Sequence, residues 1–180
     1  NNYTSLSDDC GATGSATVTF TATDGCGNTA TATATFTIED TTAPIIETIA
    51  TNLTVECDGN GNATDLNNWL ASQGGASASD SCSNVTWTNN YTSLSDACGA
   101  TGTATVTFTA TDDCGNTATT TATFTIEDTT NPVMDVDASD LTVECDGNGN
   151  IDQLNNWLAT QGGASASEIC SNLSWTNDFT

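Results

Sequence analysis

The sequence predicts an all-β fold of tandem immunoglobulin-like β-sandwich repeats, with one short helix inserted per repeat. Three observations predict this fold class. The chain repeats itself every 88 residues, so that the segment 55–62 returns as 143–150. Long segments alternate apolar residues with threonine, which is typical of strands that have one buried and one solvated face. The eight cysteines all recur at the same offset, as the pairs 10/98, 26/114, 57/145 and 82/170.

The 88-residue period also sets the expected domain boundaries. Glu39 to Pro44 and its copy, Glu127 to Pro132, punctuate the chain. We therefore expect residues 43–130 to form one complete immunoglobulin-like repeat. Residues 1–42 would be the C-terminal part of one repeat, and residues 131–180 the N-terminal part of another. The chain is expected to be a window onto a longer array.

Short strands are expected in the first half of the complete repeat. An edge strand should begin at Ile45, directly after a proline, and two further strands cover residues 52–57 and 84–91. These segments are rich in the β-branched and aromatic residues that strands favour. Trp87, in the last of them, is expected to be a core residue.

One helix is expected between these strands, over residues 64–73. Thr64 would cap its first turn and Gly74 would end it. The apolar residues fall at the i, i+3, i+4 spacing of a single helix stripe. They are Leu66, Trp69 and Leu70.

A hairpin of two long strands, 103–111 and 117–126, is the clearest local prediction. The connection between them carries the Asp, Gly and Asn residues that tight turns need. Threonine suits the outer face because it favours strands and tolerates water. The inward-facing set is expected to be Ala104, Val106, Phe108, Ala110, Ala118, Ala122, Phe124 and Ile126.

The charge of the chain excludes several classes of partner and of chemistry. The chain has no Lys, Arg or His and 23 Asp and Glu residues, giving a net charge of −23. Nucleic-acid binding and attraction to anionic membrane surfaces both need basic residues, so neither partner is expected. Acid–base catalysis would fall to carboxylates alone. We therefore expect a protein that is not an enzyme.

Four cysteines in each repeat predict a disulfide framework formed in an oxidising compartment. Zinc is disfavoured because the chain has no His and no C-x-x-C pair. Four cysteines allow three pairings. An immunoglobulin-like strand order favours Cys57–Cys114, which would tie the two sheets, and leaves Cys82–Cys98 as the second pair.

The segment from Val106 to Pro132 resembles the hyalin-repeat family, whose modules end in a similar "TATD-x-x-GN-T … DTT-x-P" stretch. The strand around Val55 is similar only loosely, and the helix at 64–73 departs from a plain hyalin repeat. The fuller pattern, with "VECDGNGN", "LNNWLASQGGA" and "TVTFTATD-x-CGN", resembles repeats in giant cell-surface adhesins of the Bacteroidetes, including gliding-motility adhesins. This resemblance implies immunoglobulin-like modules, export by the type IX secretion route and a long extracellular filament.

Calcium is the cofactor that the acidic residues favour, because hard cations take several oxygen ligands from carboxylates and turn carbonyls. An immunoglobulin-like order would bring the linker entering a domain close to the loops after Cys57 and Thr111, and so gather carboxylates at the domain joints. The alternative is that Asp58 and its neighbours simply make turns. The candidate ligands are Glu39, Asp40, Asp58, Asp112, Asp113, Asn116, Glu127, Asp128 and Asp146.

Two threonines match a modification pattern. Asp40-Thr41-Thr42 and Asp128-Thr129-Thr130 resemble the Asp-Ser/Thr O-glycosylation pattern of Bacteroidetes exported proteins, which makes Thr41 and Thr129 candidate acceptors. Chance is the competing explanation in so threonine-rich a chain.

These observations predict a non-catalytic structural repeat that forms the rigid stalk of a long extracellular bacterial adhesin at the cell surface. Adjacent repeats of the same chain would be its main partners, with other filaments or surface glycans as further candidates. The alternative is an adhesive module that binds glycan or ice through its Thr-rich strand faces or acidic loops. Sheet twist disfavours ice, because a twisted row of threonines matches a flat lattice poorly.

Overall fold

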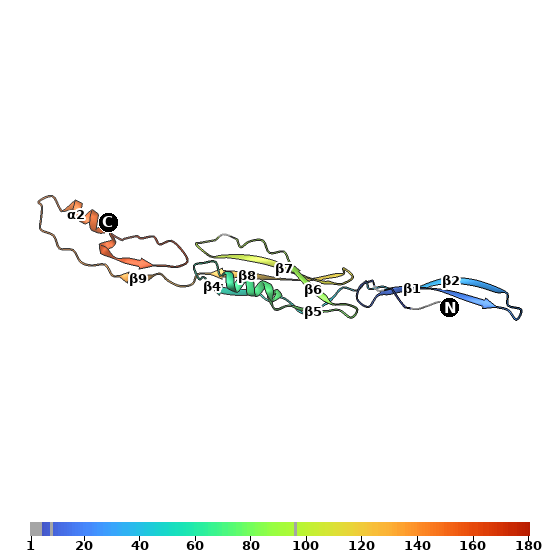
Figure 1. Cartoon of the computed structure of the whole chain (residues 1–180). Helices are drawn as coiled ribbons and strands as arrows, with labels where there is room; N and C mark the ends of the chain where they lie inside the picture. The colour runs from blue at the N-terminus through green and yellow to red at the C-terminus, as the bar shows by residue number, and fades with distance from the viewer. Residues whose placement is uncertain (1–4, 8, 96) are drawn as a thin grey trace. The chain divides into compact units, whose positions relative to one another are not determined.

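The computed structural model describes residues 5–7, 9–95 and 97–180, and most of its regular elements are strands (Figure 1). Two short 3₁₀ turns, Gln73–Gly75 and Gln161–Gly163, follow the two helices. None of the helices in the described part of the chain is long and apolar enough to cross a membrane. In chain order the elements are β1 Gly14–Thr23, β2 Thr29–Ile38, β3 Ile45–Thr48, β4 Leu53–Glu56, α1 Ala63–Ala71, β5 Ser77–Ser79, β6 Val85–Asn89, β7 Gly102–Asp112, β8 Thr117–Glu127, β9 Val133–Val136, α2 Ile151–Ala159 and β10 Ser165–Ser167.

The contacts within the chain define two compact units, which interleave residues of the predicted complete repeat. The first unit comprises Asn1–Leu53, Asn67–Ser93 and Thr105–Phe124. The second comprises Thr54–Leu66, Leu94–Ala104 and Thr125–Thr180.

The largest sheet has four strands in the order β4-β8-β7-β6. Its centre is the β7–β8 hairpin, as the sequence predicts. The inward side chains of β7 are buried completely or nearly so, and Phe124 on β8 is 0% exposed. On the outer face, threonine hydroxyls bond to each other across the hairpin, with Thr105 to Thr123 at 3.1 Å and Thr107 to Thr121 at 3.3 Å. The period-two alternation therefore predicts both faces correctly.

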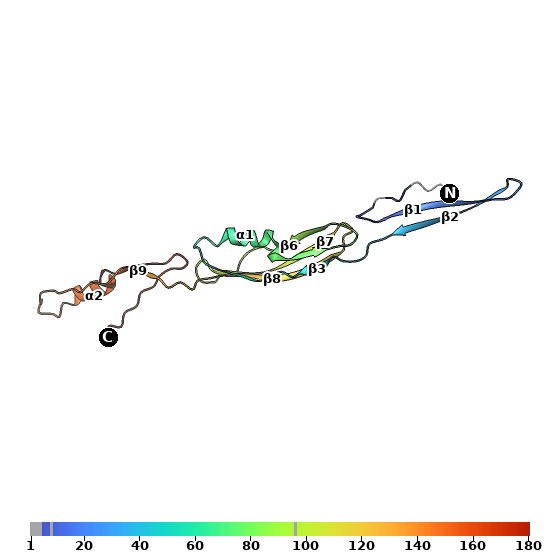
Figure 2. The same cartoon turned by 90° about the horizontal axis from the view of Figure 1, so that it is seen from below.

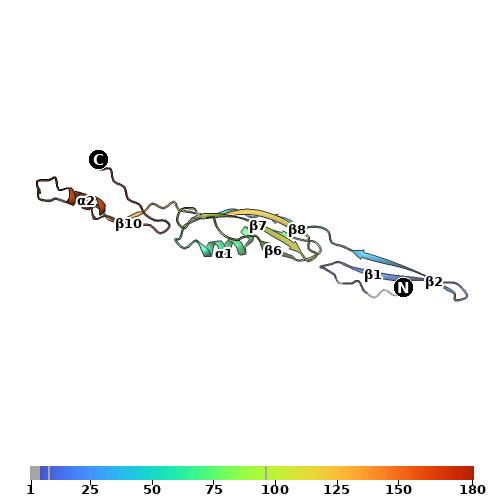
Figure 3. The ribbon, with the colours of Figure 1, turned by 90° about the horizontal axis from the view of Figure 1, so that it is seen from above.

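Helix α1 covers the inner face of this sheet (Figures 2 and 3). Trp69 packs against Phe108 and Phe124, with ring centroids 5.3 and 5.6 Å apart. Its indole Nε1 donates a hydrogen bond to the carbonyl of Thr51 at 3.0 Å, so the polar atom of the buried ring is satisfied. The helix thereby supplies the bulkiest side chain of the core.

The start of α1 differs from the expectation that Thr64 caps it. The helix begins at Ala63, so that Thr64 lies exposed inside the first turn. The preceding residue, Asn62, adopts a φ of +47° and is 3% exposed. Its side chain donates to the carbonyl of Glu56 and to the carboxylate of Asp65. Asn62 tolerates the left-handed conformation and bonds locally, so it occupies the position that a capping threonine would take.

Strand β4 runs in the same direction as its neighbour β8. At one end the side chain of Asn52 accepts a hydrogen bond from the backbone of Thr123, and at the other the amide of Cys57 donates to the carbonyl of Glu127. The predicted edge strand at Ile45 is β3, which pairs antiparallel with β5. Strand β5 was not anticipated, because its Ser-Ala-Ser sequence carries no strand signal.

The flanking segments repeat parts of this architecture. The β1–β2 hairpin is the counterpart of β7–β8, and it pairs Phe20 with Ala32 and Ala16 with Phe36. The pair β9–β10 is the counterpart of β3–β5, and α2 is the counterpart of α1. Each flanking segment therefore contains elements that the other lacks.

Candidate functional site

Two disulfides join segments that are more than one 88-residue period apart in the chain. Cys10 bonds Cys114, and Cys57 bonds Cys170, with Cα–Cα distances of 5.2 and 6.0 Å. The sequence separations are 104 and 113 residues. A disulfide framework is confirmed, but its predicted connectivity is wrong. Neither Cys57–Cys114 nor Cys82–Cys98 forms, and Cys26, Cys82, Cys98 and Cys145 are free thiols.

The direction of β4 explains why Cys57 does not reach Cys114. Cys57 lies beside Glu127, at the C-terminal end of β8, whereas Cys114 precedes the first residue of that strand. An eleven-residue strand is about 35 Å long. The two sulfurs are therefore at opposite ends of β8, too far apart for a bond.

The same backbone contact accompanies both bridges. The amide of Ala12 donates to the carbonyl of Cys82 at 2.7 Å, and the amide of Ala100 donates to the carbonyl of Cys170 at 2.8 Å. Both residues of the second contact lie 88 positions after those of the first. We call the surroundings of Cys10–Cys114 the first joint, in the first unit, and those of Cys57–Cys170 the second joint, in the second unit.

Glycine is needed at both joints. Gly11 has a φ of +56° and Gly99 a φ of +61°. A Cβ at Gly11 would collide with the carbonyl oxygen of Cys82, and one at Gly99 with that of Cys170. The close backbone approach therefore depends on the absence of a side chain at this position.

Asp112 and Asn116 connect the β7–β8 turn to the linker at the first joint. Asp112 is 4% exposed and accepts two hydrogen bonds from Asn116, from its amide at 2.8 Å and from its side chain at 2.9 Å. Burial raises the pKa of Asp112, but these hydrogen bonds outweigh burial, so the pKa lies below its usual value. The side chain of Asn116 also donates to the carbonyl of Asp40 at 3.1 Å. The predicted approach of the linker to this turn is therefore present.

Asp113 and Asp58 have different surroundings. The exposed Asp113 accepts a hydrogen bond from the amide of Asn84 at 3.3 Å. Asp58 does not join this group, contrary to the expectation, because it belongs to the second unit. The residue after it, Gly59, lies against the backbone of Ile169 there. The cause is again the direction of β4, which carries the loop after Cys57 away from the β7–β8 turn.

Asp58 and Asp146 organise their own turns. Asp58 accepts hydrogen bonds from the amides of Asn60 at 2.7 Å and Asn62 at 3.0 Å, and these bonds hold the pKa of Asp58 below its usual value, the one from Asn62 being the larger cause. Asp146 does the same with Asn148 and Asn150, and its pKa is lowered as well. These carboxylates therefore have the turn-forming role that the alternative interpretation gave them.

A pair of acidic residues recurs at the joints. Asp40 and Asp80 lie together with Cys82, and their counterparts Asp128 and Glu168 lie together with Cys170, with the potential ligand atoms of each group within 4.8 Å of one another. Cys170 is bonded to Cys57, so its sulfur is no thiolate ligand, and the two carboxylates are left as cation ligands.

Within the described residues, Asp40 Oδ2 is buried without a hydrogen-bond partner, while Oδ1 accepts from the amide of Thr42 at 3.0 Å. The sequence reasoning overlooked Asp80 and Glu168. Their signal was the 88-residue period, which places an acidic residue two positions before a cysteine in both repeats. Glu39 and Glu127 are exposed and outside these groups.

Thr129 is held by a carboxylate. Its amide and hydroxyl donate to Glu56 at 2.9 and 2.8 Å, and the hydroxyl of Thr130 donates to the same carboxylate at 2.9 Å. These bonds, with that from the amide of Thr129 the largest cause, lower the pKa of Glu56. The other candidate acceptor, Thr41, is exposed. A glycan on Thr129 would replace the proton that the hydroxyl donates to Glu56.

Comparison with known proteins yields no family for this chain. No family model matches it, and a search of curated proteins finds no match. The resemblance to hyalin repeats stays a prediction, and the function is argued below from the joints.

Proposed function

We propose that this chain is a non-catalytic structural repeat in the stalk of a long extracellular adhesin on a bacterial cell surface. The observation that carries the proposal is that both disulfides connect one repeat to the next. A disulfide that served only to stabilise a bead would close within it. A bridge between successive beads instead limits how far they can be pulled apart.

The covalent path along the chain supports this role. Cys10 and Cys98 occupy equivalent positions, 88 residues apart. The bridge from Cys10 to Cys114 leaves only the 16 residues between Cys114 and Cys98 to be traversed. Fully stretched, those 16 residues span about 55 Å, against about 310 Å for 88 residues. Tension would therefore lengthen a bridged repeat far less than an unbridged one.

Composition supports the proposed location. Disulfides persist in oxidising environments such as the cell exterior. A net charge of −23 with no basic residue keeps neighbouring stalks apart by repulsion. Repeated short strands in several sheets, with the non-consecutive order β4-β8-β7-β6, support immunoglobulin-like modules. Export by the type IX route belongs to the same proposal, on the sequence resemblance alone.

The threonine faces favour a structural role over glycan or ice binding. The hydroxyls of Thr105 and Thr107 bond to threonines across the hairpin, and so do those of Thr17 and Thr35 at 2.8 Å in β1–β2. Hydroxyls that satisfy one another strengthen the sheet and have less capacity left for a ligand.

A divalent cation at the joints is part of the proposal. Asp40 and Asp80 lie close together, and the chain contains no cationic side chain that could neutralise them. Calcium accepts two carboxylates together with carbonyls and water. Bound there, it would stiffen the connection between the linker and the following repeat.

The test is single-molecule extension of the chain held at its two ends, with the free thiols alkylated. Between Cys10 and Cys170 the shortest covalent path is the 47 residues from Cys10 to Cys57, followed by the second bridge. The expected limit is about 165 Å, rising on reduction to about 560 Å for 160 residues.

Two variants make the test specific for this connectivity. Cys57→Ser leaves the first bridge and the 56 residues from Cys114 to Cys170. Cys57→Ser combined with Cys114→Ser should restore the full 160 residues without reductant. A limit of 103 residues in the oxidised parent chain, which the pairs Cys57–Cys114 and Cys82–Cys98 would give, would refute the proposal.

A further inference from the structure

The two flanking segments are complementary parts of one repeat. Residues 131–180 correspond to 43–92 of the complete repeat, and residues 5–42 correspond to 93–130. Together they cover a whole repeat once. Each flanking segment leaves open the apolar surface that the missing part covers in the complete repeat.

The open surface of the N-terminal segment is the inner face of the β1–β2 hairpin. Phe20 and Phe36 are 56% and 63% exposed, whereas their counterparts Phe108 and Phe124 are both 0% exposed. The counterparts are covered by Trp69 of α1. The β1–β2 hairpin has the same sequence pattern, and what it lacks is a helix carrying that tryptophan.

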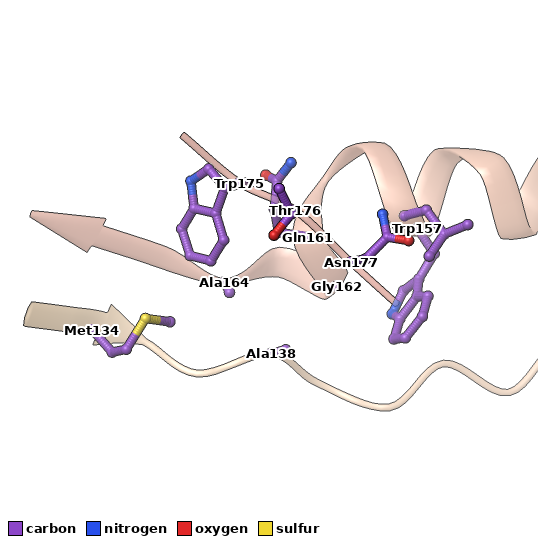
Figure 4. Close-up of a pocket in the computed structure, with 10 residues that line it drawn as sticks. Met134, Ala138, Trp157, Gln161, Gly162, Ala164, Trp175, Thr176 and Asn177 are labelled. Atoms are coloured by element: carbon purple, nitrogen blue, oxygen red, sulfur yellow. The ribbon is translucent and has the colours of Figure 1, made fainter. Parts of the chain in front are cut away.

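The C-terminal segment contains such a helix without a hairpin. Trp157 on α2 is the counterpart of Trp69 and retains its hydrogen bond, from Nε1 to the carbonyl of Ser139 at 3.0 Å. It borders a hollow of about 260 Å³ that Trp175 and Met134 also line. Figure 4 shows these three side chains around open space, where the complete repeat has its phenylalanines. Trp175 is 42% exposed.

The free thiols follow the same division. Cys98 and Cys145 are counterparts of the bonded Cys10 and Cys57, and Cys26 and Cys82 are counterparts of the bonded Cys114 and Cys170. Every free cysteine is therefore at a position that forms a bridge elsewhere in this chain. What each lacks is a partner at a separation of 104 or 113 residues.

We propose that a second copy of this chain docks head to tail, its β1–β2 hairpin covering α2 of the first copy, and that two disulfides seal the junction. If the second copy continues the numbering after two periods, its Cys26 lies 104 positions after Cys98 of the first copy. Its Cys82 then lies 113 positions after Cys145 of the first copy. One placement thus completes the open core and provides partners for the thiols at both required separations.

This inference goes beyond the proposed stalk function, since it concerns separate polypeptides. Each bridge forms by thiol–disulfide exchange with a disulfide oxidant, oxidised glutathione in the experiment below. Two cysteine thiols give up two protons and two electrons, and one oxidised glutathione becomes two reduced molecules. The contact is heterologous, so wild-type copies would grow into an open chain.

The experiment mixes two variants of the full chain. The head-blocked variant carries Cys26→Ser and Cys82→Ser, and the tail-blocked variant carries Cys98→Ser and Cys145→Ser. With oxidised glutathione, each variant alone is expected to stay monomeric on a non-reducing gel. The mixture should give a dimer only, and the wild type a ladder. Mass spectrometry of the dimer should find Cys98 linked to Cys26 and Cys145 linked to Cys82.

A second pair of variants tests the apolar contact. Phe36→Glu in the tail-blocked chain should lower the initial rate of dimer formation roughly tenfold, because it places a charge in the core. Thr37→Glu adds the same charge to the other face of β2 and should change the rate less than about twofold. Equal effects of the two variants would refute docking through this face.

Other outcomes would overturn the proposal. They are a wild type that stays monomeric, dimers of one variant linked through Cys98–Cys98 or Cys26–Cys26, and crosslinks between Cys98 and Cys82. None of them would affect the Cys10–Cys114 and Cys57–Cys170 bridges within one chain, on which the stalk function rests.

Discussion

Trp69 meets Phe108 edge-on, with their ring centroids 5.3 Å apart and their planes at 73°. This contact joins α1 to the four-stranded sheet and is made by two of the bulkiest side chains of the core. Edge-to-face pairs add roughly 0.5–1.5 kcal/mol to the free energy gained by burying the rings. Alanine and threonine dominate the rest of the repeat and bury little apolar area, so we expect stability to depend strongly on this contact.

Phe108→Ala is therefore expected to lower the free energy of unfolding by about 3–5 kcal/mol, from lost burial and the cavity left behind. Phe20→Ala is the matched control, because Phe20 has the same sequence context one repeat earlier but is 56% exposed. It should cost less than about 1 kcal/mol in a dilute, reduced monomer. Urea unfolding followed by tryptophan fluorescence measures both. Similar losses for the two variants would contradict this account of the core.

Much of the fold could be predicted from the sequence. Strands β7 and β8 and their inward residues follow from strict alternation, since only period two keeps Val106 and Phe108 on one face. Helix α1 follows from the spacing of Leu66 and Trp69. The sequence reasoning did not anticipate that β4 runs parallel to β8. That direction depends on long-range pairing, which no local pattern encodes.

The pairing of the cysteines could not be deduced for a related reason. Cys82 and Cys170 have nearly the same neighbours, so the sequence around them cannot tell a partner in the same repeat from one in the next repeat. Only the three-dimensional arrangement distinguishes them. The acidic pair of Asp40 and Asp80 was missed because Asp80 is remote in sequence from the other expected ligands.

Gly74→Ala should destabilise the repeat more than Gly75→Ala. Both glycines have positive φ, +64° and +83°, so either substitution carries a backbone penalty of roughly 1 kcal/mol. A Cβ at Gly74 would also lie 3.2 Å from the Cβ of Ala50 and 3.3 Å from the ring of Phe108. At Gly75 the nearest atom is 3.9 Å away. We expect Gly74→Ala to cost roughly 1–3 kcal/mol more than its neighbour, as measured by urea unfolding.

Asp112 should make stability depend on pH in the acid range. Its folded-state pKa lies below the ordinary value of 3.8, so its contribution is present above that value and is lost as the pH falls through the folded pKa. The difference in stability between wild type and Asp112→Asn should therefore be constant from pH 7 to about 5 and shrink below about 4.

Asp152→Asn is the control for the general relief of repulsion in a chain of net charge −23, because Asp152 is exposed on the first turn of α2. Urea unfolding at a series of pH values gives both curves. An Asp112→Asn difference that grew on acidification would reverse the sign argued here.

Calcium should raise the melting temperature of the oxidised chain through Asp40 and Asp80. A ligand present at 100 times its dissociation constant stabilises by about 2.7 kcal/mol, which is a shift of several degrees for a domain of this size. Magnesium should act more weakly, because two carboxylates and carbonyls form a poor octahedral site. The double variant Asp40→Asn, Asp80→Asn should lose most of the response at the first joint. A second double variant, Asp137→Asn with Asp152→Asn, removes the same charge from exposed positions and should keep the response. If both double variants and the wild type shift equally, calcium acts by screening the charge of the chain, and the joint carboxylates bind no cation.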